Sequence, residues 1–122
     1  MSRFVYYNAN PRGEKENDCV TRAILLASGL DYQTVREKLH YTAKLLNCDK
    51  LCVCCYRHLL DDVLKYKRIE CDGYTLGEFA DEYPYGVYLV RMNGHLSCLI
   101  DGTVYDIWDC RKEWLTDVWK VE

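Results

Sequence analysis

The sequence predicts a single α+β domain in which helices come first and an antiparallel sheet follows. Apolar residues recur at helical spacing between residues 19 and 66, whereas the last third carries two consecutive two-residue hairpin signals, Asn93-Gly94 and Asp101-Gly102. The length of 122 residues suffices for one hydrophobic core but not for a catalytic domain plus a separate binding domain. We therefore expect N-terminal helices packed on a C-terminal antiparallel sheet.

The first helix is expected to begin at Cys19, after an irregular segment over residues 1–17 that is rich in turn formers. Asn17 or Asp18 can cap this helix, and Gly29 can end it. Three more helices should follow: one capped by Asp31 through about residue 46, one over about 51–66, and a short one from Thr75 to before Pro84.

The strands are expected to follow as a meander, with one short strand before it. The short strand covers 68–71, the meander strands cover 87–92, 95–100 and 103–109, and an edge strand covers 114–121.

The turn at 101–102 fixes which residues of its two strands face each other. Because it contains two residues, the strands pair outward from it, which places Ser97 opposite Asp106 and His95 opposite Trp108. His95 and Asp106 are then diagonal neighbours on one face, about 7–8 Å apart at Cα. A carboxylate there can orient the imidazole and fix its tautomer, while Trp108 covers the pair and excludes water.

Cys19 is the candidate nucleophile that would use this pair. It falls in the first turn of a predicted helix, where the helix dipole favours thiolate over thiol, and a neighbouring imidazolium would favour it further. Its backbone N–H is also free to donate to an oxyanion.

A cysteine that opens a helix, a histidine that begins a strand and an Asp-x-Trp on the next strand follow the chain order of the papain-like peptidases. Asp106-Ile107-Trp108 resembles the Asn-Ser-Trp of that family, and Asp18-Cys19 resembles the helix start of the bacteriocin-processing peptidases. The stretch 10–24, with Gly94-His95 and 105–109, is similar to small uncharacterised members from phage and bacterial genomes.

This resemblance implies a papain-like fold and a thiol protease, isopeptidase or similar hydrolase that acts on a protein or peptide substrate. The implied catalytic triad is Cys19, His95 and Asp106. Family members place a glutamine six residues before the nucleophile to complete the oxyanion hole, but Gly13 stands at that position. Asn10 and Asn17 each carry an amide donor and are the candidates to replace it.

Four of the eight cysteines, at positions 48, 52, 54 and 55, lie within eight residues. They contain a single C-x-x-C, whereas a structural zinc site commonly uses two such pairs. On a continuous helix Cys48, Cys52 and Cys55 would share a face, as core residues also do. We expect no metal and no other cofactor.

Composition excludes two classes of partner. The net charge of −3 and the lack of a basic patch argue against nucleic-acid binding. No apolar run approaches the roughly 20 residues that cross a bilayer, and the N-terminus lacks an apolar signal-peptide core. We expect the cytoplasm, either of a bacterium or of the host cell if the protein is phage-encoded, and no membrane.

Two other classes of function fit the same residues. One is a catalytically inactive papain-like module that binds another protein, for instance a phage protein that blocks a host factor. The other is a metal-stabilised interaction protein built on the cysteine cluster. A thiol-reactive probe separates the first from an enzyme, and metal analysis tests the second.

Overall fold

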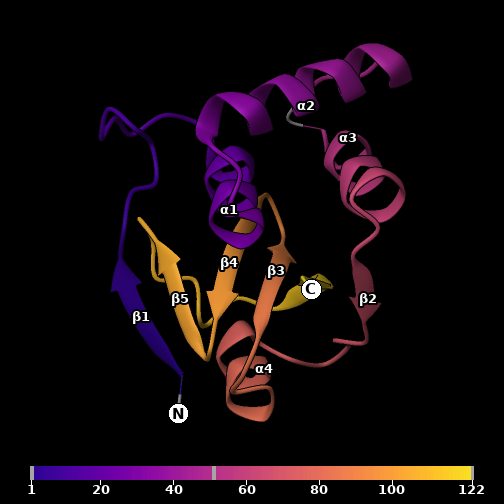
Figure 1. Cartoon of the computed structure of the whole chain (residues 1–122). Helices are drawn as coiled ribbons and strands as arrows, with labels where there is room; N and C mark the ends of the chain where they lie inside the picture. Colours follow the sequence, from indigo (N-terminus) through magenta and orange to yellow (C-terminus); the bar gives the residue numbers. More distant parts are fainter. Residues whose placement is uncertain (1, 51, 122) are drawn as a thin grey trace.

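A computed structural model describes residues 2–50 and 52–121 of the chain. It has the α+β organisation, with a six-stranded mixed sheet in the order β1-β5-β4-β3-β6-β2 (Figure 1). The helices are α1 (Cys19–Ser28), α2 (Tyr32–Leu46), α3 (Val53–His58) with its π-helical continuation η1 (Leu59–Val63), and α4 (Leu76–Glu82). The strands are β1 (Arg3–Tyr6), β2 (Lys67–Ile69), β3 (Val87–Met92), β4 (His95–Ile100), β5 (Thr103–Asp106) and β6 (Leu115–Val121).

The helix boundaries follow local signals in the sequence. Gly29 adopts the left-handed conformation that ends α1, and the Asp31 carboxylate accepts the Thr34 N–H at 2.7 Å to cap α2. Thr75 begins α4 with the expected cap. The helix predicted over 51–66 is shorter and changes to π-helical geometry at Leu59; its predicted start at Leu51 lies outside the described residues.

Strands β3 and β4 have the predicted bounds, and the register beyond Asp101-Gly102 is confirmed, since Cys98 pairs with Tyr105. The order of the outer strands differs from the prediction. The segment expected to be irregular contains β1, which pairs in parallel with β5, so the sheet is mixed rather than antiparallel. Strand β6 pairs with both β3 and β2 and is not an edge strand. The positions of β1 and β6 both depend on pairing with segments that are distant in sequence, and no local sequence pattern reveals such pairing.

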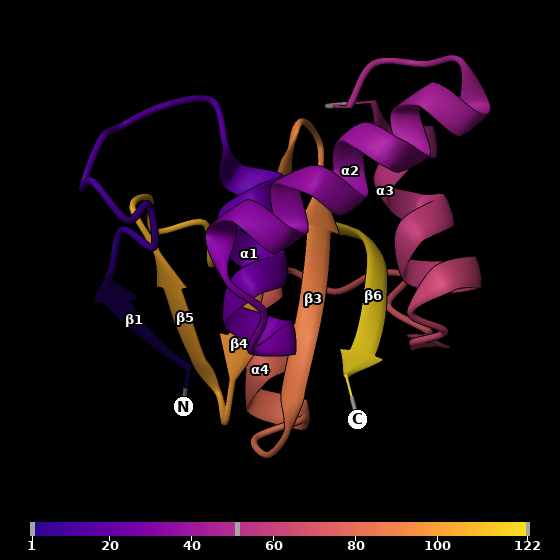
Figure 2. The ribbon, with the colours of Figure 1, turned by 45° about the horizontal axis from the view of Figure 1, so that its top comes forward.

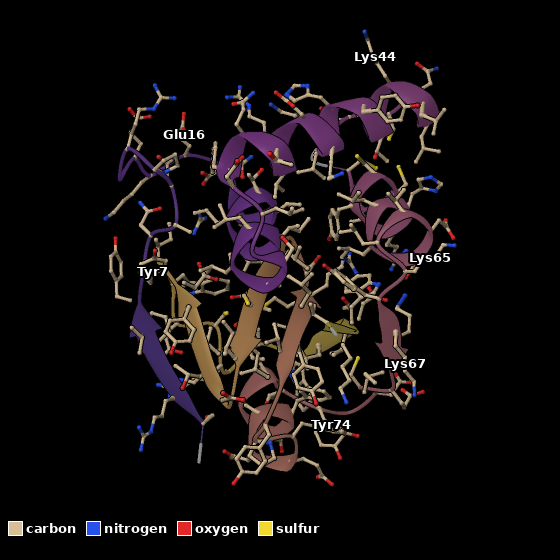
Figure 3. All side chains as sticks on the ribbon, viewed as in Figure 1. Tyr7, Glu16, Lys44, Lys65, Lys67 and Tyr74 are labelled. Atoms are coloured by element: carbon tan, nitrogen blue, oxygen red, sulfur yellow. The ribbon has the colours of Figure 1, made fainter. Side chains whose placement is uncertain are left out.

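Helices α1, α2 and α3 lie over one face of the sheet and α4 lies on the other (Figure 2), and a cluster of buried side chains fills the space on each face. Apolar side chains of α1, α2 and α3 pack with Leu89, Leu96 and Trp119 on one face. On the other face Phe79 of α4 packs with Leu99 and neighbouring strand residues. Charged side chains such as Lys44, Lys65 and Lys67 point outward (Figure 3). Within the described residues, every helix is too short or too polar to cross a bilayer.

Candidate active site

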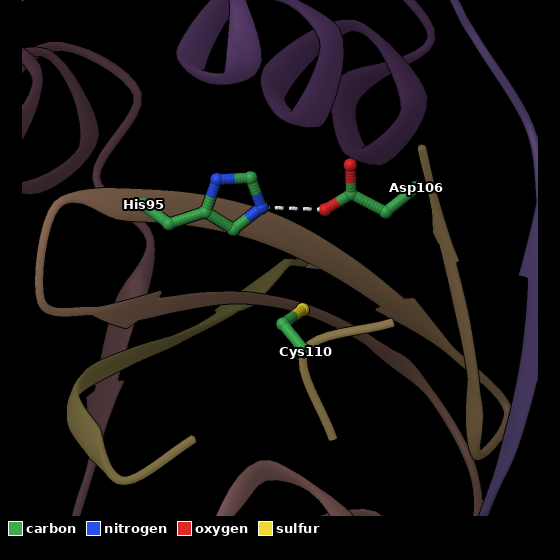
Figure 4. A group of neighbouring side chains, drawn as sticks. All are labelled: His95, Asp106 and Cys110. Atoms are coloured by element: carbon green, nitrogen blue, oxygen red, sulfur yellow. Dashed lines mark hydrogen bonds and ion pairs between the residues drawn. The ribbon is translucent and has the colours of Figure 1, made fainter. Parts of the chain in front are cut away.

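His95 and Asp106 meet where β4 begins and β5 ends, at one end of the sheet. The His95 Nε2 lies 2.6 Å from Asp106 Oδ2, as the hairpin register predicted (Figure 4). The Ser97 hydroxyl donates to the same carboxylate oxygen at 2.6 Å. Both members of the pair are well buried, with side chains 12% and 4% exposed for His95 and Asp106. The bond therefore forms in a largely water-excluded place, where it orients the ring strongly.

Asp106 is held ionised by donors on both of its oxygens. Its Oδ1 accepts from the Ile107 backbone N–H at 2.7 Å and from Arg22 Nη1 at 3.2 Å. Burial raises the pKa of the Asp106 carboxyl, but the bonds from His95, Ser97 and Ile107 outweigh burial and lower it below its usual range. Strand β5 ends at Asp106 rather than at the predicted Asp109, because the backbone leaves the sheet at Ile107.

Cys19 is the first residue of α1, as predicted, and its thiol lies close enough to the His95 ring for each side chain to shift the pKa of the other. Burial raises the pKa of this thiol. The bond from His95, the bond from the Leu96 backbone, and the charges of His95 and Arg22 together outweigh burial, so the pKa is lowered. Because His95 uses Nε2 for Asp106, its Nδ1 is the nitrogen left to serve the thiol. The thiol of Cys19, the imidazole of His95 and the carboxylate of Asp106 therefore follow one another in that order.

His95 itself is held in its protonated form. Burial lowers the pKa of the ring, but hydrogen bonds with Asp106, Cys110 and Cys19 and the Asp106 charge outweigh burial and raise it to about 11. The lowered thiol pKa and the raised imidazole pKa both shift the proton from the thiol toward the ring. The Trp108 ring meets His95 edge to face, with centroids 5.0 Å apart, and is itself 44% exposed. It covers one edge of the site as expected.

The two amide side chains proposed for the oxyanion hole are in different places. Asn17 lines a cavity of about 150 Å³ together with Cys19 and His95. Asn10 is buried elsewhere, and its amide group donates to Glu16 at 2.9 Å and Asp18 at 3.0 Å. Both amide hydrogens of Asn10 are thus in use, so the expectation that it could complete the oxyanion hole is wrong.

In the described part of the chain no side chain caps α1, contrary to the expectation that Asn17 or Asp18 would do so, and its first backbone N–H groups have no partner within the helix. The Asp18 carboxylate instead accepts from Asn10, from Arg22 Nε at 2.7 Å and from the Tyr32 hydroxyl at 3.0 Å. Arg22 therefore bridges two buried carboxylates, Asp18 before the nucleophile and Asp106 behind the histidine.

Three residues of the site were not predicted. Arg22 had a visible signal, because it stands four residues after Asp18 at the spacing of a helical ion pair. Cys110 comes from the loop after β5 and lies beneath the His95–Asp106 pair (Figure 4). Tyr56 of α3 lines the cavity, and its hydroxyl accepts from Arg91 Nε at 2.9 Å. The last two are placed by tertiary packing alone, which no sequence spacing indicates.

Two groups of side chains could be considered for a metal ion. Ligand atoms of His95, Asp106 and Cys110 lie within 4.8 Å of one another. The His95–Asp106 bond of 2.6 Å leaves no space for an ion between them, and the Asp106 oxygens are taken by other donors. Among the described residues, no three of the cysteines at 48, 52, 54 and 55 bring their sulfur atoms within 4.8 Å of one another.

A thiol, an imidazole and a carboxylate in series beside free helix N–H groups form the arrangement that nucleophilic catalysis uses. The thiol and the imidazole line one small cavity with Asn17, while Asp106 bonds the far nitrogen of the ring and orients it. Comparisons with family models, with curated proteins and with solved structures find no match for this chain.

Proposed function

We propose that the chain is a papain-like cysteine hydrolase that cleaves an amide, isopeptide or thioester bond in a protein or peptide substrate. The observation that carries the proposal is the series Cys19–His95–Asp106, in which the thiol at the start of α1 and the ring line one cavity and the ring bonds the carboxylate at 2.6 Å. The order of these residues along helix and strands is also that of the papain-like peptidases. Eight free cysteines fit a reducing cytoplasm.

The reaction would begin with attack of the Cys19 thiolate on the substrate carbonyl carbon. A sulfur–carbon bond forms, and the carbonyl π electrons move to the oxygen as an oxyanion. When the oxyanion collapses, the carbon–leaving group bond breaks and His95 gives its proton to the leaving group. The resulting thioester is hydrolysed by a water molecule whose proton His95 accepts. Asp106 keeps the ring oriented and stabilises its charge in both steps.

The oxyanion would be stabilised by the Cys19 backbone N–H and by the Asn17 amide. Cys19 is the first helical residue, so its N–H has no partner within α1. Asn17 lines the same cavity as the sulfur and the ring. An amide two residues before the nucleophile therefore takes the role that the family gives to a glutamine six residues before it.

The first test is the pH dependence of alkylation at each cysteine. Iodoacetamide near pH 6 should label Cys19 ahead of the buried cysteines, because its pKa is lowered. His95→Ala should remove this advantage, whereas Asp106→Asn should reduce it less, since an amide can still orient the ring. Cys52 is the internal control: its pKa is lowered by Cys54 instead, so its labelling should not respond to His95→Ala.

The second test separates an enzyme from a binding module on the same fold. With p-nitrophenyl acetate, the wild type should release p-nitrophenolate in a burst, carry an acetyl group on Cys19 by mass spectrometry, and then turn over. Labelling of Cys19 that depends on His95, without acyl-enzyme formation or turnover, would favour the binding module. Equal labelling of Cys19 and the buried cysteines, unchanged in His95→Ala, would rule out an activated thiolate.

A further inference from the structure

Four cysteines, none of them part of the triad, lie together where α2 ends and α3 begins. Asn47 ends α2 in the left-handed conformation, and the Cys48 N–H bonds the Ala43 carbonyl at 2.9 Å, which fixes Cys48 to the end of α2. Cys52 is the N-cap residue of α3, and Cys54 and Cys55 stand in its first turn. Figure 3 shows sulfur atoms, in yellow, gathered at this junction.

The four thiols differ in their neighbours and exposure. Cys52 Sγ and Cys54 Sγ are 2.8 Å apart, and Cys54 is exposed while Cys52 is partly exposed. Cys48 contacts Cys54 and Cys55. Cys55 is buried, and its thiol donates to the Leu39 carbonyl at 3.4 Å. The Cys52–Cys54 pair combines a direct sulfur contact with access to solvent.

We propose that Cys52 and Cys54 form a dithiol site that hydroperoxides oxidise reversibly to a disulfide. The Cys52 thiolate attacks one peroxide oxygen, the O–O bond breaks, and Cys52 becomes a sulfenic acid as hydroxide leaves. Cys54 sulfur then attacks Cys52 sulfur, the S–O bond breaks, and the second hydroxide leaves. The two thiol protons convert both hydroxides to water, so two thiols lose two electrons and one peroxide gains them.

The division of roles within the pair follows from its hydrogen bonding. The Cys54 thiol lowers the pKa of Cys52 by hydrogen bonding to it, and the Cys52 and Cys48 sulfurs raise the pKa of Cys54 to about 12. Cys52 is therefore the thiolate that meets the oxidant, and Cys54 remains a thiol until the sulfenic acid has formed. A low-pKa, accessible cysteine beside a resolving cysteine is the usual arrangement of peroxide-reactive sites.

The site stands close to the triad cavity. Val53, which lies between the two cysteines in sequence, lines the same cavity as Cys19 and His95. A disulfide across Val53 would fix the backbone on both sides of this cavity wall. The proposal itself needs no hydrolase activity, so its outcome is independent of the proposed function.

The experiment treats the full chain with equimolar hydrogen peroxide and follows its tryptic peptides by mass spectrometry. Peptide 51–57 contains Cys52, Cys54 and Cys55, whereas Cys48 falls in peptide 45–50 and Cys19 in peptide 16–22. Peptide 51–57 should lose two hydrogens and regain them with dithiothreitol. Cys71 and Cys110, which are buried, should stay reduced over the same time.

Two variants and a control assign the roles. In Cys54→Ser, Cys52 should stop at the sulfenic acid and be trapped by dimedone. In Cys52→Ser, oxidation of peptide 51–57 should slow by about tenfold or more, because Cys54 stays protonated. Cys48→Ser, as the control for the identity of the pair, should still form the disulfide within peptide 51–57. A disulfide joining peptides 45–50 and 51–57, dimedone trapping on Cys54, or a wild-type rate in Cys52→Ser would each overturn the assignment.

Discussion

Arg22 offers the most decisive test of how the site is built into the fold. Its side chain is 7% exposed and bonds two buried carboxylates, Asp18 at 2.7 Å and Asp106 at 3.2 Å. Arg22→Met preserves most of the side-chain volume and removes the charge, so both carboxylates lose their positive partner. Removing one member of a buried ion pair commonly costs about 3–5 kcal/mol, because the remaining charge is left uncompensated.

For Arg22→Met, the expected loss in the free energy of unfolding lies near the lower end of that range. Asp18 keeps its bonds from Asn10 and Tyr32, and Asp106 keeps those from His95 and Ser97. We therefore expect the free energy of unfolding to fall by about 3 kcal/mol. With a urea m-value of about 1–3 kcal/mol/M, the midpoint should fall by roughly 1–3 M.

Arg57→Met is the matched control for this measurement. The Arg57 side chain is 43% exposed, and its partner Asp117 also receives bonds from Arg68 and Arg91. Arg57→Met should therefore lower the free energy of unfolding by less than about 1 kcal/mol. Urea unfolding followed by far-ultraviolet circular dichroism measures both variants. If Arg22→Met loses no more stability than Arg57→Met, the buried bridge does not hold the site together, and the reasoning fails.

Three further outcomes are expected. Asn17→Ala should slow acetylation of Cys19 by about 10²-fold, as loss of one oxyanion donor does in other enzymes. The pH dependence of Cys19 alkylation should stay unchanged in this variant. A shifted pH dependence would mean that Asn17 acts on the thiolate instead. The free energy of unfolding should be higher in the wild type than in His95→Gln, and this difference should be full below about pH 6.5 and shrink as pH rises toward about 11, because the folded pKa of His95 is raised. Chemical unfolding at several pH values measures the difference. A difference that grows with pH would contradict the prediction. Protein purified without added metal should hold no stoichiometric zinc or iron at the cysteine cluster, because the sulfur contacts in the described residues do not provide a tetrahedral site. Elemental analysis of the purified protein measures the metal content.

The sequence predicted the features that depend on neighbours along the chain. The turns at Asn93-Gly94 and Asp101-Gly102 place β3 and β4 correctly, and the second turn brings His95 to Asp106. A two-residue turn leaves little freedom in the register, so counting outward is reliable. The start of α1 at Cys19 is equally local.

The remaining features depend on tertiary packing. Nothing in residues 3–6 indicates a parallel partner a hundred positions away, yet β1 pairs with β5 there. Cys110 reaches His95 through the path of a loop, and Asn10 is drawn away from the cavity by its bonds to Glu16 and Asp18. Sequence spacing identifies which side chains have suitable chemistry, but packing decides which of them reach the cavity.

The internal position of β6 has a consequence for the order of events during synthesis. Cys19 leaves the ribosome early, while β3 cannot complete its pairing until residues 115–121 have been made, because β6 lies between β3 and β2. Until then β3 lacks its second partner strand, although the β4–β5 hairpin that brings His95 to Asp106 has already been made. Such long-range pairing also delays folding, since the closing contacts are distant in sequence. A stalled or truncated product that ends before β6 would thus contain all three triad residues but leave the edge of β3 unpaired, and an unpaired strand edge is a site of aggregation.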